Sequence, residues 1–188
     1  MARTKIDAAD LLEALTGLFR DRGYEGSSLS DIAAATGLQR ASLYHRFPGG
    51  KREMALAVLQ HFQRRLREHV LAAAWESGAP GTRSKRMARE LDGFYEGGKR
   101  NCPLESLSLA CTSTDVRLAL QATSDVCIEG FARLAKDAGH HPAAARRLGR
   151  DAFAALQGSL VVARISQDPQ AFQRFLRELP GQLTENPR

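Results

Sequence analysis

The chain has 188 residues, of which 43% are hydrophobic and 26% charged, and its formal net charge is +6 at pH 7. This composition is that of a globular protein and excludes the disordered and fibrous classes. No apolar run approaches the roughly 20 residues that a membrane-spanning helix needs, and charged residues occupy the N-terminus where a signal peptide has its apolar segment. We therefore expect a soluble, cytoplasmic protein with no membrane partner.

Three short helices are predicted at the start of the chain, whereas strand patterns are rare throughout. The first helix covers about residues 5–22. The second begins at Ser28, which has capping-box spacing to Asp31, and ends at Gly37, because glycine readily adopts the left-handed conformation that closes a helix. A third covers about residues 40–47.

Longer helices are predicted in the remainder of the chain. Apolar residues recur every fourth position after Lys51, and another helical pattern extends over residues 115–138. Proline favours the first turn of a helix, and the later prolines stand at the starts of helical patterns: Pro80, Pro103, Pro142 and Pro169. The sequence therefore predicts an all-α fold of about nine helices.

The turn at residues 35–39 joins the second and third predicted helices, with Gly37 at the bend. This is the spacing of a helix-turn-helix motif, in which the N-terminal side chains of the second helix reach the edges of DNA bases. Spacing alone is equally compatible with a turn that only packs two helices together. The residue identities are needed to decide between the two.

These identities resemble the N-terminal domain of the tetracycline-repressor (TetR) family over about the first 55 residues. The matching segments are Ala14–Phe19, Gly23–Tyr24, Ser27–Leu29, Asp31–Ala33, Thr36–Gly37 and Leu43–Pro48, followed by Lys51. The resemblance implies a three-helix DNA-binding domain, a linker helix and a C-terminal helical domain that dimerises and usually binds a small molecule. We expect a helix-turn-helix domain over residues 1–50 and a ligand-binding and dimerisation domain over residues 51–188.

A weaker similarity lies in the C-terminal region, at Asn101–Leu104 and Leu107–Ala110. It resembles the branch of the family related to multidrug-responsive and flavonoid-responsive repressors. For the family as a whole, the resemblance implies a repressor that controls its own gene and an adjacent efflux or detoxification gene.

The third helix of such a domain lies in the major groove. Arginine pairs bidentately with guanine and glutamine with adenine, so Gln39 and Arg40 are candidates for base reading, together with Ser42. The resemblance assigns phosphate contacts to Tyr44 and His45, and a helix N-terminus and a lysine also suit phosphate. The predicted DNA contacts are Ser28, Gln39, Arg40, Ser42, Tyr44, His45 and Lys51.

Two residues depart from the family pattern. Gln39 stands where serine or threonine is common, and Arg46 stands where an aromatic residue or histidine is common. These departures predict an unusual target sequence.

Apolar residues of the C-terminal region provide candidates for a ligand pocket. They carry no charged cluster, so we expect a mainly hydrophobic or aromatic ligand. Each of them could equally be an ordinary core residue. The candidates are Phe62, Leu66, Phe94, Leu107, Cys111, Cys127 and Phe131.

Small residues recur at helical spacing over residues 142–166, and the last predicted helix has an apolar face. Small residues allow two helices to approach closely, and the resemblance implies a dimer interface formed by the corresponding helix pair of each subunit. The alternative is that these helices complete the core of a single subunit. The predicted interface residues are Ala152, Ala155, Leu156, Ser159, Ala163, Phe172 and Phe175.

The remaining chemistry of the chain predicts no enzyme, metal site or cofactor. His140 and His141 lack the acid of an H-E-x-x-H motif, and no nucleophile or dinucleotide-binding motif occurs. The odd number of cysteines and the absence of a C-x-x-C pair argue against a disulfide scaffold. A free thiol, with Cys102 as the best candidate, leaves open a sensor of oxidants or electrophiles.

The combined expectation is a homodimeric repressor that binds a pseudo-palindromic DNA operator and releases it when a small-molecule inducer binds. Two alternatives stay open. One is a repressor controlled by thiol oxidation, and the other is a helical small-molecule-binding or adaptor protein that does not use DNA.

Overall fold

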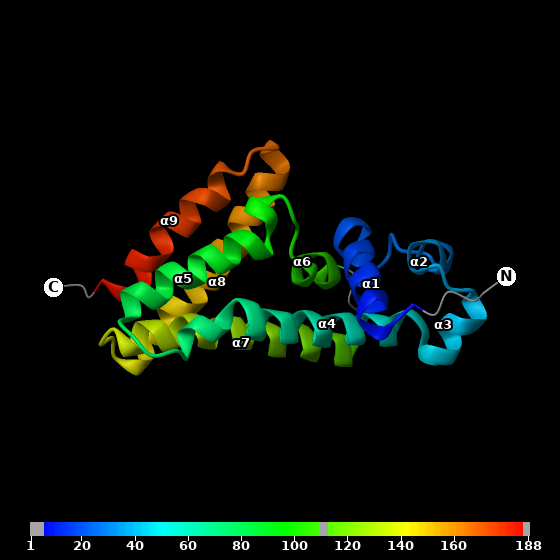
Figure 1. The fold of residues 1–188 in the computed structure, drawn as a ribbon, viewed down its shortest axis with the longest axis horizontal. Helices are drawn as coiled ribbons and strands as arrows, with labels where there is room; N and C mark the ends of the chain where they lie inside the picture. The colour runs from blue at the N-terminus through cyan, green and yellow to red at the C-terminus, as the bar shows by residue number, and fades with distance from the viewer. Residues whose placement is uncertain (1–5, 110–112, 186–188) are drawn as a thin grey trace. The chain divides into compact units, whose positions relative to one another are not determined.

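The computed structural model describes residues 6–109 and 113–185. These residues form nine α-helices and two short 3-10 helices and no strand (Figure 1), so the predicted all-α fold is confirmed. None of the described helices is both long enough and apolar enough to span a membrane.

The helices group into two compact units, which are described separately. Unit 1 comprises residues 1–63 and 103–122, and unit 2 comprises residues 64–102 and 123–188. Helices α4 (Gly50–His69) and α7 (Thr114–Asp137) each contribute to both units. The functional division predicted at residue 50 stays a prediction.

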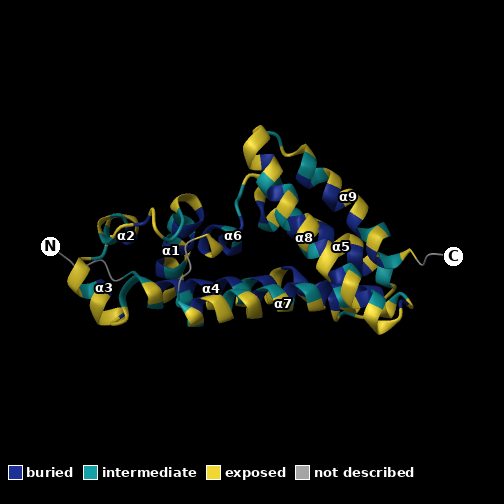
Figure 2. Cartoon of the chain, turned by 180° about the vertical axis from the view of Figure 1, so that it is seen from behind, coloured by how far each residue is buried: buried dark blue, intermediate teal, exposed yellow. Residues whose placement is uncertain are grey.

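Unit 1 is built around four helices that pack on a small core. They are α1 (Ala8–Arg22), α2 (Leu29–Thr36), α3 (Arg40–Arg46) and α6 (Pro103–Ser108), to which the first parts of α4 and α7 add. Leu15 and Phe19 of α1, Ile32 of α2 and Leu43 of α3 are fully buried. Figure 2 colours the helices by burial, with buried residues in dark blue. Burial of such apolar side chains is the main force that holds three short helices together.

Polar contacts attach α6 and α7 to the first helices of unit 1. The Ser106 hydroxyl on α6 donates a hydrogen bond of 3.0 Å to the Arg20 carbonyl oxygen on α1, and both side chains are buried. Arg52 near the start of α4 forms an ion pair with Asp115 near the start of α7. A hydrogen bond from the Ser113 hydroxyl lowers the pKa of Asp115, which keeps this carboxylate charged.

Unit 2 contains α5 (Pro80–Phe94), α8 (Pro142–Ser166) and α9 (Gln170–Thr184), with the 3-10 helices at Leu71–Ala74 and Glu96–Gly98. Helix α9 packs against both α5 and α8. An aromatic cluster forms part of the core: the Tyr95 and Phe172 rings meet edge to face with centroids 6.0 Å apart, and Phe172 stacks on Phe175 at 6.3 Å.

A buried arginine ties α5 to α7 within unit 2. Arg83 donates to the Ala74 carbonyl oxygen at 2.8 Å and to the Asp137 carboxylate at 2.9 Å. Burial opposes ionisation of Asp137, but hydrogen bonds from Arg133 and Arg83 lower the pKa of this carboxyl below its ordinary value. The pair therefore stays charged. Removing Asp137 would leave the buried Arg83 guanidinium without a charged partner, whereas removing Arg83 leaves Asp137 paired with Arg133.

Candidate nucleic-acid interface

The turn between α2 and α3 has the geometry that the spacing predicted. Gly37 closes α2 in the left-handed conformation, with φ 67° and ψ 9°. A side chain at this position would be strained, so glycine fits the turn better than other residues. The Thr36 hydroxyl donates to the Ile32 carbonyl oxygen at 2.7 Å and fixes the last turn of α2. Helix α3 then begins at Arg40, three residues after the bend.

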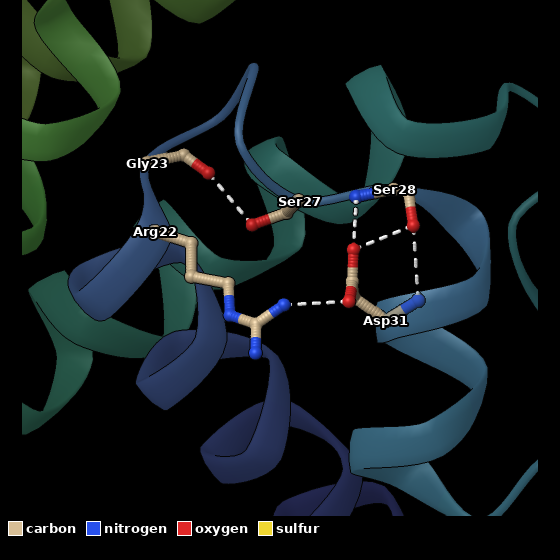
Figure 3. Close-up of polar contacts among 5 residues, drawn as sticks. All are labelled: Arg22, Gly23, Ser27, Ser28 and Asp31. Carbon is tan, nitrogen blue, oxygen red and sulfur yellow. Dashed lines mark hydrogen bonds and ion pairs between the residues drawn. The ribbon is translucent and has the colours of Figure 1, made fainter.

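The N-terminus of α2 carries the predicted capping box (Figure 3). The Asp31 amide donates to the Ser28 hydroxyl oxygen at 3.1 Å, and the Ser28 amide donates to the Asp31 carboxylate at 3.0 Å. The Ser28 hydroxyl also donates to this carboxylate, and these bonds, followed by the charge of Arg22, lower the pKa of Asp31. Both polar groups of Ser28 are therefore already engaged, and a phosphate at this end of α2 would meet the following first-turn amides.

Two further contacts in Figure 3 fix α2 relative to α1. Arg22 near the end of α1 forms an ion pair of 2.6 Å with Asp31. The buried Ser27 hydroxyl donates to the Gly23 carbonyl oxygen at 2.7 Å. Sequence reasoning identified the capping box but not Arg22, because an ion pair across nine residues has no periodic signal.

Helix α3 presents the predicted base-reading residues on its exposed side. Gln39 precedes the first turn and makes no side-chain cap bond, so its amide is available to a ligand. Arg40 is exposed and donates a hydrogen bond to the Ser30 hydroxyl oxygen of α2. Ser42 is half-buried, whereas Leu43 is fully buried behind these residues.

The predicted phosphate contacts are also accessible. Tyr44 and His45 are exposed on α3, and Tyr44 exposes 46% of its surface, which is unusual for a large aromatic residue without a partner. Lys51 is half-buried, with its Nζ atom 4.4 Å from the centre of the Tyr24 ring and 3.9 Å from a Glu25 carboxylate oxygen. Both contacts hold the ammonium group at the start of α4.

Arg46, the second departure from the family pattern, has a local role. Its guanidinium donates to the Ile6 carbonyl oxygen at 3.2 Å. This contact joins the end of α3 to the residues that precede α1. Sequence reasoning did not identify this contact, because the two residues are 40 positions apart.

The predicted ligand-pocket residues do not all belong to one unit. Phe62 and Leu107 are buried in unit 1, whereas Leu66, Cys127 and Phe131 are buried and Phe94 is half-buried in unit 2. Cys111 lies outside the described residues. The side chains therefore contribute to hydrophobic cores, as the core interpretation expected, and a binding role for them stays a prediction.

Sequence reasoning did not identify the polar neighbours of Cys102 in unit 2. The Tyr95 hydroxyl and the Gln157 side-chain amide both donate to the Cys102 sulfur at 3.5 Å. Tyr95 and Cys102 are buried, whereas Gln157 is half-buried. Burial raises the pKa of the Cys127 thiol well above its usual range, so this cysteine is protonated and unreactive near neutral pH.

Most of the predicted dimer-interface residues are buried within the single chain. Ala152, Leu156 and Ala163 of α8 and Phe172 and Phe175 of α9 each expose 5% or less of their surface. The apolar face of α9 packs against α5 and α8 within the single chain, and the dimer interface stays a prediction. Of the predicted set, only Ala155, which is exposed, and Ser159, which is half-buried, are accessible.

Comparison with known proteins agrees with this geometry. Residues 11–58 match the family model described as bacterial regulatory proteins, tetR family. The chain is 24% identical over 121 residues to the HTH-type transcriptional regulator LmrA of Bacillus subtilis, a match that covers 64% of this chain and 63% of the relative. It is 26% identical over 188 residues to the HTH-type transcriptional repressor DhaR of a Mycobacterium species, a match that covers 94% of this chain and 91% of the relative.

Solved structures share the fold. A TetR transcriptional regulator from Legionella pneumophila superposes with a TM-score of 0.84 at 16% identity, covering 97% of this chain and 98% of the other. A cysteine mutant of the TetR-family regulator CifR was solved with a 26-base-pair operator. It has a TM-score of 0.76 at 22% identity, and the match covers 99% of this chain and 100% of the other.

These findings support a DNA-binding transcriptional regulator of the repressor type: residues 11–58 match the tetR family model, and the fold is that of TetR-family regulators. Such regulators are not enzymes. The interpretation as an adaptor that does not use DNA is therefore not supported.

Proposed function

We propose that this regulator is a cytoplasmic homodimeric repressor that binds a pseudo-palindromic operator and releases it when a small apolar or aromatic molecule binds. Two copies of α3 would enter successive major grooves, and the ligand would change the separation of the two copies. A dimer whose recognition helices no longer match the half-site spacing cannot bind both half-sites together.

The observation that carries the proposal is the composition of unit 1. The three N-terminal helices share this unit with α6 and the start of α7, which lie far from them in sequence. The hydrogen bond from Ser106 to Arg20 and the ion pair between Arg52 and Asp115 join these segments. A ligand that displaces α6 or α7 would therefore also displace α1 or α4, and with them the position of α3.

The candidate ligand contacts support an apolar ligand. Leu66, Phe131 and Cys127 are apolar and buried in unit 2, so a ligand that enters between them would meet apolar side chains. The Gln157 amide, which is half-buried, would provide a polar contact that orients such a ligand.

The dimer would form through the exposed face of α8. Ala155 and Gly158 lie on this face, followed by Val162, which exposes 50% of its surface, and Ile165, which exposes 75%. Small residues beside exposed branched residues favour close packing of two helices, and a large exposed apolar stripe favours association with a partner.

The test is footprinting of the purified protein on the DNA upstream of its own gene, with and without a panel of apolar aromatic compounds. We expect protection of a two-fold symmetric site that at least one compound abolishes. The Arg40→Ala variant is the control for sequence-specific protection. Symmetric protection that no apolar compound changes would support operator binding but contradict induction by an apolar ligand.

A further inference from the structure

A groove of about 260 Å³ lies between α5 and α9 in unit 2. Two of its apolar lining residues, Ala88 and Leu176, are buried, and Pro180 adds a half-buried ring. Because α5 and α9 pack against each other, the shape of the groove is set by the core beneath it. Its volume is just below the roughly 300–1,000 Å³ of pockets for drug-sized ligands, so it suits a smaller molecule.

Three cations line the groove without an acidic partner. Lys85 and Arg89 lie one turn apart on α5, and Arg177 faces them from α9. Within the described residues, none of the three forms an ion pair. Like charges one helical turn apart repel each other, so this arrangement is unfavourable until an anion is present.

Other arginines of the same helix behave differently. Arg83 pairs with Asp137 at 2.9 Å, and Arg86 pairs with Glu76 at 2.7 Å. Carboxylates therefore form ion pairs with arginines elsewhere on α5, but none forms an ion pair with the three cations of the groove among the described residues.

One acidic residue lines the groove beside the three cations, so the positive charge of the lining exceeds its negative charge. Asp92 lines the groove, but it accepts a hydrogen bond of 2.7 Å from the Gln173 side-chain amide. Glu178 and Glu185 line a neighbouring hollow together with Lys85 and Arg177, and neither carboxylate forms an ion pair with these cations.

We propose that this groove binds a small amphipathic monocarboxylate. The carboxylate would lie among Lys85, Arg89 and Arg177, where charge-assisted hydrogen bonds are strongest, and the hydrocarbon part would cover Ala88 and Leu176. None of the residues that we propose for the inducer lines the groove, so this site is separate from the proposed inducer site.

The test uses octanoate as the probe, with 1-octanol and acetate as comparisons. Octanol lacks the charge and acetate lacks the hydrocarbon chain. Calorimetry should show binding of octanoate about tenfold tighter than either comparison, because each lacks one of the two complementary parts. Methyl resonances of Ala88 and Leu176 should shift in nuclear magnetic resonance spectra as octanoate is added.

Variants locate the site. Arg89→Gln and Arg177→Gln should each weaken octanoate binding about tenfold, since each removes one charge-assisted contact. Arg174→Gln is the matched control, because Arg174 is exposed on α9 but does not line the groove. All three side chains lie at the surface, and circular dichroism checks that each variant is folded.

Two results would overturn the proposal. One is octanoate binding that is equal in the parent, the groove variants and the control. The other is a set of shifts confined to Cys127 and Phe131, which would place octanoate at the proposed inducer site. Because footprinting measures inducer release, failure of the groove proposal leaves that result unaffected.

Discussion

The two units present their candidate functional side chains in opposite ways. In unit 1, Arg40, Tyr44 and His45 are exposed on a helix whose core residue, Leu43, is fully buried. In unit 2, the candidates Leu66, Cys127 and Phe131 are themselves buried. A DNA-reading surface thus differs in residue type from the core that supports it, whereas an apolar pocket uses the same residue types as a core. Candidate DNA contacts can therefore be predicted from the sequence of unit 1, whereas pocket residues of unit 2 cannot be told apart from core residues by sequence.

The largest expected effect concerns the face of α8 that unit 2 leaves exposed. Ala155→Arg should give a folded monomer, because the substitution places unpaired like charges at a symmetric contact. Operator affinity should fall about 100-fold or more, since two linked half-sites bind far more tightly than one. Sedimentation and fluorescence anisotropy measure the two effects.

The matched control for this change is Ala72→Arg, at an exposed alanine of unit 2 outside α8. It should remain a dimer with parent affinity. If Ala155→Arg also remains a dimer, the interface lies elsewhere. If it becomes a monomer that still binds the full operator at parent affinity, the spacing mechanism is wrong.

The next largest effect concerns the buried ion pair of unit 2. Arg83→Ala should lower the free energy of unfolding by about 3 kcal/mol, because it removes a buried side chain that donates to both the Ala74 carbonyl oxygen and the Asp137 carboxylate. Arg86→Ala removes an arginine of the same helix from an exposed ion pair and should cost at most about 1 kcal/mol. Urea unfolding followed by circular dichroism measures the free energy of unfolding of both variants. Equal losses of stability would contradict the larger contribution that we assign to Arg83.

Two substitutions in unit 1 separate base reading from phosphate binding. Arg40→Ala should lose roughly 1–3 kcal/mol of discrimination at one base pair if Arg40 reads guanine. Lys51→Ala should weaken binding about equally on all sequences. It should also reduce the slope of log affinity against log salt concentration by about one, because one counterion fewer is released on binding. A panel of operator variants measured at several salt concentrations tests both, and a uniform loss for both variants would refute the division.

A smaller effect is expected at the capping box of α2. Ser28→Ala should lower the stability of unit 1 by about 1 kcal/mol, the usual cost of removing an N-cap hydroxyl. Because the folded pKa of Asp31 is depressed, its contribution is present above the ordinary pKa of 3.8 and is lost as pH falls through the lower folded value. Thermal unfolding between pH 2 and pH 6, roughly the range over which carboxylates titrate, should show this loss in the parent but not in Asp31→Asn.

The smallest effect is expected for the cysteines. A variant with Cys102, Cys111 and Cys127 changed to alanine or valine should bind operator and release it with inducer as the parent does. Burial keeps Cys127 protonated, and its main contribution is packing. Release by peroxide or a quinone in the parent but not in the variant would contradict this and favour control by thiol oxidation.

The sequence allowed prediction of local features more reliably than long-range ones. The capping box of Ser28, the bend at Gly37 and the start of α3 at Arg40 are all found in the structure, because each depends on residues within a few positions. The contact from Arg46 to Ile6 and the attachment of Ser106 to α1 were not predictable, because they join residues 40 and 86 positions apart. The apolar periodicity of α9 was visible, but it does not show whether the helix faces its own core or a partner.

The most direct test of the central claim is selection of bound duplexes from a pool of random DNA by the purified protein. A dimer that reads DNA through two copies of α3 should enrich a pseudo-palindrome whose half-sites are separated by about one helical turn. The Arg40→Ala variant should lose preference at one base pair of each half-site. Enrichment of single, unpaired half-sites would contradict the dimeric mechanism, and no enrichment at all would contradict sequence-specific DNA binding.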